Sequence, residues 1–192
     1  DAMKTWGAAT DGPKFAGIAP MAPHEPFDDP PAAFLPPGYV IGSSQRAKYE
    51  AAVIALDAHL SSLLMVLDMS NTYVVVMSDN GTPHQVPPPN GQSPGYKLTQ
   101  YQGGINVILG VWGPGVLAGV DDSLVQHTDL ARTIFDLCSV VPSSGFVDSI
   151  SFAPTLFGAA GTRQHTYTSR FTPNDGTSGA LTINNWSVTR ID

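Results

Sequence analysis

The stretch VVVMSDNG, residues 74–81, decides the fold class of this chain. Together with the two residues before it, its apolar start forms TYVVVM (72–77), which is β-branched and apolar without alternation. This predicts a strand covered on both faces. Such strands are typical of a parallel sheet in an α/β domain. The strand ends on a carboxylate, a carboxamide and a glycine, namely Asp79, Asn80 and Gly81. Because α/β proteins bind ligands at the carboxyl ends of their strands, these polar residues are candidates for a site.

The neighbouring segments predict helices and one further strand. After Arg46, apolar residues recur every three or four positions, which predicts a helix of about six turns that packs on the sheet. They are Val53, Leu56, Leu60, Leu63, Leu64 and Leu67. A loop rich in prolines (82–96) precedes INVILGVW (105–112), which is predicted to be a second buried strand. Upstream, KFAGIAPMAPHEPF (14–27) predicts a strand end followed by a long loop.

A second helix is predicted over HTDLARTIFDLC (127–138), where apolar residues again have helical spacing. Thr128 or Asp129, near its start, is suited to be its cap or the acidic residue of its first turn. We expect Asp129 to be structural, capping this helix and fixing the adjacent loop. Cys138, the single cysteine of the chain, is expected in the core and cannot form an internal disulfide.

The C-terminal stretch LTINNWSV (181–188) predicts an antiparallel hairpin. It alternates around Asn184 and Asn185, which tolerate the left-handed conformations of a tight turn. We therefore expect an α/β fold with a mainly parallel sheet covered by helices in residues 1–165. Residues 166–192 are expected to begin a small antiparallel C-terminal subdomain.

The composition excludes two classes of partner. With 16 acidic and 9 basic residues the net charge is -7, so the chain lacks the basic face of a nucleic-acid-binding protein. No apolar run approaches the roughly 18 residues that a membrane-spanning helix requires. We expect no nucleic-acid partner and no membrane segment in this chain.

Asp79 and Asn80 are chemically suited to a hard divalent cation. A carboxylate oxygen and an amide oxygen are ligands that Ca²⁺ and Mg²⁺ prefer, whereas a histidine at position 80 would favour zinc. Gly81 lets the backbone turn away. The same Asp-Asn-Gly sequence is equally typical of an ordinary turn, so both interpretations stay open from these residues alone.

Five blocks of the chain, in the same order, resemble the sulfatase family of the alkaline phosphatase superfamily. SDNG is similar to the family's Ser/Ala-Asp-Asn-Gly strand end, and YKLTQYQGGINVILGVWGPG (96–115) to its lysine-bearing Gly-Gly block that leads to Trp-x-Pro-Gly. Three more blocks resemble family segments: APMAPHEPF (19–27), YEAAVIALDAHLSSLL (49–64) and HTDLARTIFDL (127–137). The resemblance implies an alkaline-phosphatase-like fold, of which this chain is the C-terminal half of the catalytic domain.

The resemblance also implies a function, the hydrolysis of sulfate monoesters. Asp79 and Asn80 would be ligands of the active-site cation, usually Ca²⁺ in sulfatases, with Mg²⁺ as the alternative. Lys97 would contact the sulfate group, and His24 would lie near it from the other side. The cation acts as a Lewis acid on the ester, while lysine and histidine donate hydrogen bonds as negative charge moves to the leaving oxygen.

The chain departs from the family pattern at several places, among them the nucleophile motif and the lysine loop. It contains neither Cys-x-Pro-x-Arg nor Ser-x-Pro-x-Arg, whose first residue becomes the formylglycine nucleophile, and Cys138 has neither required neighbour. The glycines that flank the family's lysine are Tyr96 and Leu98 here. We therefore expect this chain alone to be inactive and to need the N-terminal half of the same enzyme as its partner.

Two alternatives to a sulfatase remain. One is a catalytically silent module, a pseudoenzyme that keeps a metal or anion pocket for binding only. The other is a phosphoester hydrolase of the same superfamily. Asn80 speaks against the second alternative, because the two-zinc members typically have histidine at that position.

Overall fold

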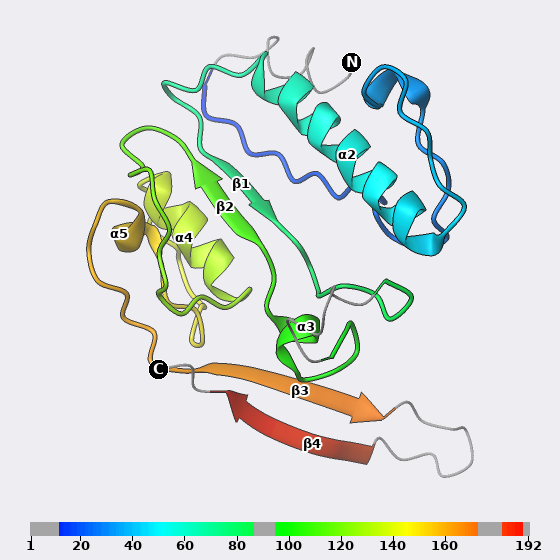
Figure 1. Cartoon of the computed structure of the whole chain (residues 1–192). Coiled ribbons are helices and arrows are strands. Elements are labelled where there is room, and N and C mark those ends of the chain that lie inside the picture. Colours follow the sequence, from blue (N-terminus) through cyan, green and yellow to red (C-terminus); the bar gives the residue numbers. More distant parts are fainter. Residues whose placement is uncertain (1–11, 87–94, 173–181, 190–192) are drawn as a thin grey trace. The chain divides into compact units, whose positions relative to one another are not determined.

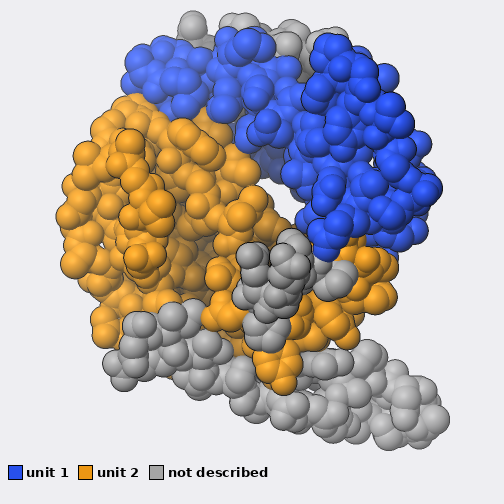
Figure 2. Space-filling model, viewed as in Figure 1, with its two compact units in different colours: residues 1–72 blue, residues 73–192 orange. Residues whose placement is uncertain are grey.

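The computed structural model of the chain describes residues 12–86, 95–172 and 182–189. The chain divides into two compact units, Asp1–Thr72 and Tyr73–Asp192 (Figure 2). This division differs from the predicted boundary between residues 165 and 166, which stays a prediction.

The first unit contains one long helix, α2 (Gln45–Leu64) (Figure 1). The Ser44 side chain accepts a hydrogen bond of 3.1 Å from the Ala47 N–H, which satisfies one of the donors left open at the helix start. With 20 residues, α2 confirms the predicted helix and its length. Its fully buried residues are small, namely Ala51, Ala52 and Ala55, and the predicted leucine face is only half-buried. The packing of α2 on a sheet stays a prediction, since the strands belong to the second unit.

Phe27 is the aromatic anchor of the first unit. Its side chain is 7% exposed and meets the ring of Tyr49 edge-on, with 5.7 Å between the ring centroids. The short helix η1 (Ala32–Phe34) contacts α2, and the Phe34 ring lies 3.8 Å from that of His59. Aromatic contacts therefore attach the loop that follows His24 to the helix.

The predicted strand end before His24 is not found. Residues 12–31 contain no strand in the structure, and residues 12–22 are exposed. Within the described residues no second segment pairs with this one, and an extended segment without a partner cannot satisfy its backbone groups in a sheet. His24 therefore lies in a loop that follows extended chain.

The second unit contains a sheet of two strands, β1 (Val74–Met77) and β2 (Leu109–Trp112), which lie side by side (Figure 1). The two predicted strands (72–77 and 105–112) are confirmed, although both are shorter than expected. Their pairing is antiparallel, with β1 starting opposite the end of β2, so the predicted parallel sheet is not confirmed in the described residues. The strand residues are half-buried rather than fully covered, apart from Trp112, which is exposed.

Three helices accompany this sheet: α3 (Gln102–Ile105), α4 (Asp129–Leu137) and α5 (Ala153–Leu156). The predicted second helix is confirmed by α4. Because α4 ends at Leu137, Cys138 lies at its C-cap and is exposed, so the expectation of a core cysteine is wrong. No helix in the described part of the chain is long and apolar enough to cross a membrane.

The C-terminal hairpin is confirmed, but its turn is not where the sequence predicts it. Strands β3 (Thr166–Thr172) and β4 (Thr182–Thr189) pair antiparallel, and their connection lies outside the described residues. Asn184 and Asn185 lie inside β4. Arg170 pairs with Asn185 and Phe171 with Ile183, which leaves Asn184 as the extra residue of a β-bulge. The conformational tolerance of asparagine here permits a bulge instead of a turn.

Candidate functional site

The candidate cation ligands, Asp79 and Asn80, follow β1 directly, and Ser78 fixes the backbone at their start. The Ser78 N–H donates to the Ile108 carbonyl at 3.2 Å, which extends the ladder between the strands. The Ser78 hydroxyl donates to the Asn80 carbonyl at 2.7 Å. The carbonyl of Ser78 is 3.0 Å from the ring Nε2 of His127. The N–H, the hydroxyl and the carbonyl of Ser78 therefore each take part in a hydrogen bond.

Gly81 fixes the backbone on the other side of these two residues. Its N–H donates to the Gly104 carbonyl at 3.0 Å. A Cβ at position 81 would lie 2.0 Å from the Gly103 carbonyl oxygen and 2.7 Å from the Gly104 Cα, which no real side chain tolerates. The close approach of these two backbone segments thus requires glycine at position 81. Glycine at position 104 is required by another contact, because a Cβ there would lie 2.4 Å from the Thr99 carbonyl oxygen.

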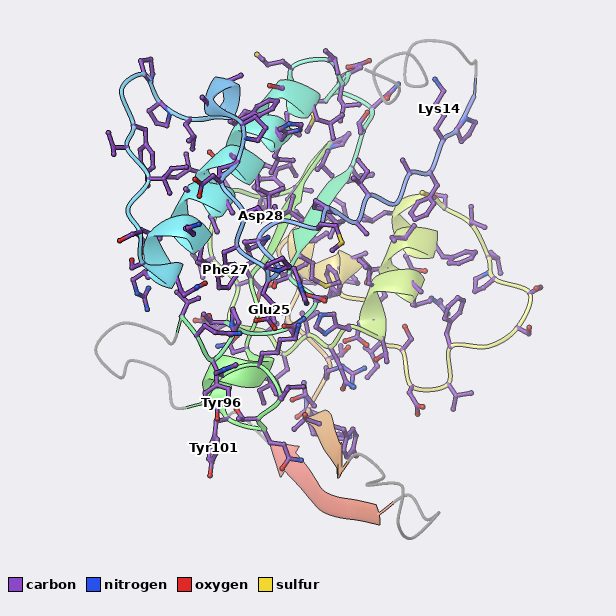
Figure 3. The ribbon with its side chains drawn as sticks, turned by 90° about the vertical axis from the view of Figure 1, so that its right-hand side faces the viewer. Lys14, Glu25, Phe27, Asp28, Tyr96 and Tyr101 are labelled. Carbon is purple, nitrogen blue, oxygen red and sulfur yellow. The ribbon has the colours of Figure 1, made fainter. Side chains whose placement is uncertain are left out.

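The Lys97 loop lies against the segment that follows Gly81. The Lys97 N–H donates to the Thr82 carbonyl at 2.8 Å. Leu98 has φ of 73°, a left-handed conformation that glycine adopts without strain and leucine does not. The loop therefore keeps a glycine-like backbone at a position where the side chain departs from the sulfatase pattern. Tyr96 and Tyr101, both exposed, extend from the segment that leads into α3 (Figure 3).

His24 belongs to the first unit, whereas the other three candidate residues belong to the second. It is exposed, and its Nδ1 lies 2.6 Å from the Glu25 carbonyl oxygen. Because a carbonyl oxygen only accepts, Nδ1 carries the proton in this contact. The gathering of His24, Lys97 and the two predicted cation ligands around one cleft stays a prediction.

The donor chemistry of Asp79 and Asn80 fits a hard cation. Asp79 is exposed, and its carboxylate makes no hydrogen bond or ion pair with another residue of the described ranges. Two oxygen ligands are fewer than the six to eight that Ca²⁺ takes. In the described part of the chain no group of three or more His, Cys, Asp and Glu side chains is placed to hold a metal.

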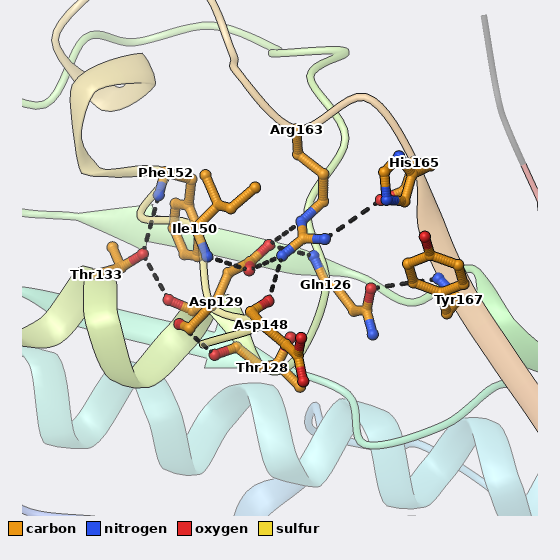
Figure 4. Close-up of polar contacts among 11 residues, drawn as sticks. Gln126, Thr128, Asp129, Thr133, Asp148, Ile150, Phe152, Arg163, His165 and Tyr167 are labelled. Atoms are coloured by element: carbon orange, nitrogen blue, oxygen red, sulfur yellow. Dashed lines mark hydrogen bonds and ion pairs between the residues drawn. The ribbon is translucent and has the colours of Figure 1, made fainter. Parts of the chain in front are cut away.

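Asp129 is structural, as the sequence predicts, and its partner Arg163 is a residue that sequence reasoning missed. The side chains are 1% and 6% exposed, and one guanidinium edge of Arg163 meets the carboxylate, with Nε donating to Oδ2 at 2.7 Å and Nη2 donating to Oδ1 (Figure 4). Asp129 also accepts from the backbone N–H groups of Gln126 and Ile150, each at 2.8 Å. The Asp129 carboxylate thus fixes the loop that contains Gln126 and the loop that contains Ile150. Its predicted capping role is wrong, because the N-cap is Thr128, which makes no side-chain cap bond.

No local pattern in the sequence points to Arg163 or to the contact of His127 with Ser78. The first pair is separated by 34 positions and the second by 49. His127 opens the HTDLARTIFDL block, but that pattern does not indicate a contact with Ser78. A small cavity beside the ion pair, lined by Ile150, Phe152 and Arg163 among others, has a volume of about 10 Å³. It holds at most one water molecule and is too small for a substrate.

Comparison with protein families and curated proteins gives a consistent result. The family model described as Sulfatase matches residues 1–140. "Uncharacterized sulfatase YdeN" of Escherichia coli K12 is 31% identical over 153 residues, which cover 76% of this chain and 27% of that protein. Human N-acetylgalactosamine-6-sulfatase is 34% identical over 127 residues, which cover 60% of this chain and 24% of that protein. The chain therefore spans about a quarter of the length of these curated relatives.

Comparison with solved structures supports the fold. A crystal structure named "putative sulfatase", from Bacteroides thetaiotaomicron, aligns with 88% of this chain and 41% of its own chain, with a TM-score of 0.51. The sequences are 22% identical, so this likeness concerns the fold alone. The resemblance that the sequence blocks predict is confirmed by these findings.

Proposed function

Because this chain belongs to the sulfatase family, we propose that it is part of a sulfatase-like hydrolase that cleaves sulfate monoesters. The observation that carries the proposal is the loop after β1. There the backbone is fixed on both sides of Asp79 and Asn80, while the Asp79 carboxylate is exposed and has no partner in the described residues. An ordinary turn needs no such unpaired carboxylate beside a second oxygen donor.

In this function Asp79 and Asn80 bind the divalent cation, with Ca²⁺ as the first choice and Mg²⁺ as the alternative. A bound cation supplies Lewis-acid polarisation of the sulfate ester. Lys97 donates hydrogen bonds to the sulfate oxygens, and its positive charge stabilises the negative charge that develops there. His24, whose Nδ1–H is directed to the Glu25 carbonyl, acts through Nε2 and donates a proton to the leaving oxygen when the ring is protonated.

The nucleophile must come from a partner. The sequence contains no Cys-x-Pro-x-Arg or Ser-x-Pro-x-Arg, so it offers no residue for conversion to formylglycine. We propose that the N-terminal half of the same enzyme supplies this residue and the remaining cation ligands. The two oxygen donors of this chain then form one side of a shared site.

Calorimetric titration with calcium chloride tests the role of the two ligands. We expect a weak site, with a dissociation constant in the millimolar range, because water must fill the remaining coordination positions. Asp79→Ala should abolish it. The matched control is Asp122→Ala, which removes another exposed carboxylate of the same unit and should change the affinity less than about 2-fold. Equal losses in both variants, or no binding by the wild type, would contradict the proposed cation site.

The catalytically silent module is the second candidate. It is favoured by the replacement of both lysine-flanking glycines by Tyr96 and Leu98 and by the missing nucleophile motif. Mixing this chain with an N-terminal half that contains the formylglycine motif separates the candidates. Turnover of an aryl sulfate supports the hydrolase, whereas association without turnover supports the silent module. Turnover of an aryl phosphate alone would favour the phosphoester hydrolase.

A further inference from the structure

We propose that His127 is a positioning residue that holds Asp79 and Asn80 in place for cation binding, through a hydrogen bond to the carbonyl of Ser78. The ring Nε2 lies 3.0 Å from the carbonyl oxygen. A carbonyl oxygen has no proton to give, so Nε2 carries the hydrogen and donates it. The role of the two ligands rests on the proposed function, but the contact of His127 does not.

A hydrogen bond to the Ser78 carbonyl is well placed to restrict the backbone of this loop. It belongs to the peptide unit that joins Ser78 to Asp79, so a bond to it restricts the rotation of the backbone that carries the carboxylate. The other two bonds of Ser78 run to the carbonyls of Ile108 and Asn80, both backbone groups. The bond from His127 is the one of the three that a side-chain substitution outside the loop can remove.

His127 itself stands on a rigid support. Its neighbour Gln126 donates its backbone N–H to the Asp129 carboxylate at 2.8 Å, and Asp129 is paired with Arg163 in the interior (Figure 4). The Gln126 side chain also accepts from the Tyr167 N–H at 3.3 Å. The histidine ring is exposed, but the backbone on both sides of it is fixed, so the ring reaches Ser78 from a defined position.

A bond of this kind matters for a site that binds weakly. The Asp79 carboxylate has no partner of its own in the described residues, so the backbone is what sets its direction. Groups that orient metal ligands without touching the metal typically change metal affinity about 10- to 100-fold when they are removed. We therefore expect His127 to act on cation binding without being a ligand.

Three variants test this in the full chain. His127→Ala removes the donor, whereas His127→Gln keeps an N–H donor near the position of Nε2. His165→Ala removes another exposed histidine of the same unit and is the matched control. In calcium titration we expect about a 10-fold loss of affinity for His127→Ala, less than about 3-fold for His127→Gln, and no change for His165→Ala. The thermal midpoints of all three should remain close to that of the wild type, because both histidines are exposed.

A metal-free measurement separates this inference from the proposed function. Amide hydrogen exchange of Ser78 and Gly81, whose N–H groups are bonded to Ile108 and Gly104, reports local opening of the loop. Exchange should be about 5- to 10-fold faster in His127→Ala and unchanged in the other two variants. If the wild type binds no calcium but exchange changes as expected, the positioning contact stands and the proposed cation site fails. Unchanged exchange in His127→Ala, or a failure of glutamine to restore it, would overturn the positioning role.

Discussion

Gly81 is the residue that decides whether the two loops of the candidate site can meet. It does not have a positive φ, so the requirement for glycine comes from space alone, 2.0 Å between a would-be Cβ and the Gly103 oxygen. Gly81→Ala must push the backbone of Gly103 and Gly104 in α3 away, and we expect a loss of about 2–4 kcal/mol in the free energy of unfolding. Urea denaturation of the full chain measures it. Gly119→Ala is the control, since nothing lies within 4 Å of a Cβ there, and a similar loss in both would refute the argument.

Leu98, in contrast to Gly81, has a side chain at a position whose backbone conformation suits glycine. Its φ is 73° and it is 76% exposed, so leucine gains little packing in return for the strained conformation. We expect Leu98→Gly to raise the free energy of unfolding by about 1 kcal/mol, because the left-handed conformation costs a residue with a Cβ about that much. Leu98→Ala keeps the Cβ and should bring no gain. Equal urea midpoints for the two variants would show that φ is not the cause.

At the scale of elements, the ion pair of Asp129 and Arg163 joins α4 to the segment that enters β3. Removing only the arginine leaves a carboxylate in the interior without its counter-charge. We expect Arg163→Met to cost about 3–5 kcal/mol of stability, measured by urea denaturation. Arg132→Met, which breaks the more exposed pair with Asp136 at 3.0 Å on the same helix, should cost at most about 1 kcal/mol. A ratio near one between the two losses would contradict a structural role of the buried pair.

The pH dependence of the first unit follows from Tyr49 on α2. Burial raises the pKa of Tyr49 above its ordinary value of 10.0, with nearby Arg46 opposing the shift. A raised pKa in the folded state means that stability is complete below the ordinary pKa and declines as pH rises through the raised one, because the unfolded chain loses this proton first. We expect the helical circular dichroism signal of the wild type to become more sensitive to urea above about pH 10. Tyr49→Phe should weaken this alkaline loss; an unchanged profile would exclude Tyr49 as its origin.

Helices that depend on the pattern of neighbouring residues could be predicted from the sequence. Contacts between segments that lie far apart in the chain could not. The three- and four-residue spacing after Arg46 is a property of one helix. The helix α2 begins within a residue of Arg46 but ends at Leu64, three residues before the predicted Leu67. The pairing direction of β1 depends on its partner, and a run of valines is the same in both directions. Asn184 indicated an irregular backbone but not whether it is a turn or a bulge. Arg163 had no local signal at all, because its partner lies 34 positions away.

At the scale of the whole molecule, the candidate residues are divided between two compact units, and our proposal adds a partner that completes the set. His24 lies in one unit and the other candidates in the second, while the chain matches 27% and 24% of the length of two curated relatives. The half-buried β1 and β2 are consistent with our proposal that a further half of the enzyme takes part. The candidate residues of this chain then supply ligands and hydrogen-bond donors, and the partner supplies the reacting group.

The isolated chain should therefore hydrolyse an aryl sulfate no faster than an unrelated protein, even with calcium present. Without the formylglycine motif it lacks the group that attacks the sulfur, and a cation with two hydrogen-bond donors cannot form the covalent intermediate by itself. The measurement is release of the coloured phenol over time, with wild type and Lys97→Ala compared at equal concentration. We expect the two rates to be equal at the level of the background. Turnover by the wild type that disappears in Lys97→Ala would demand a nucleophile within this chain and a different mechanism.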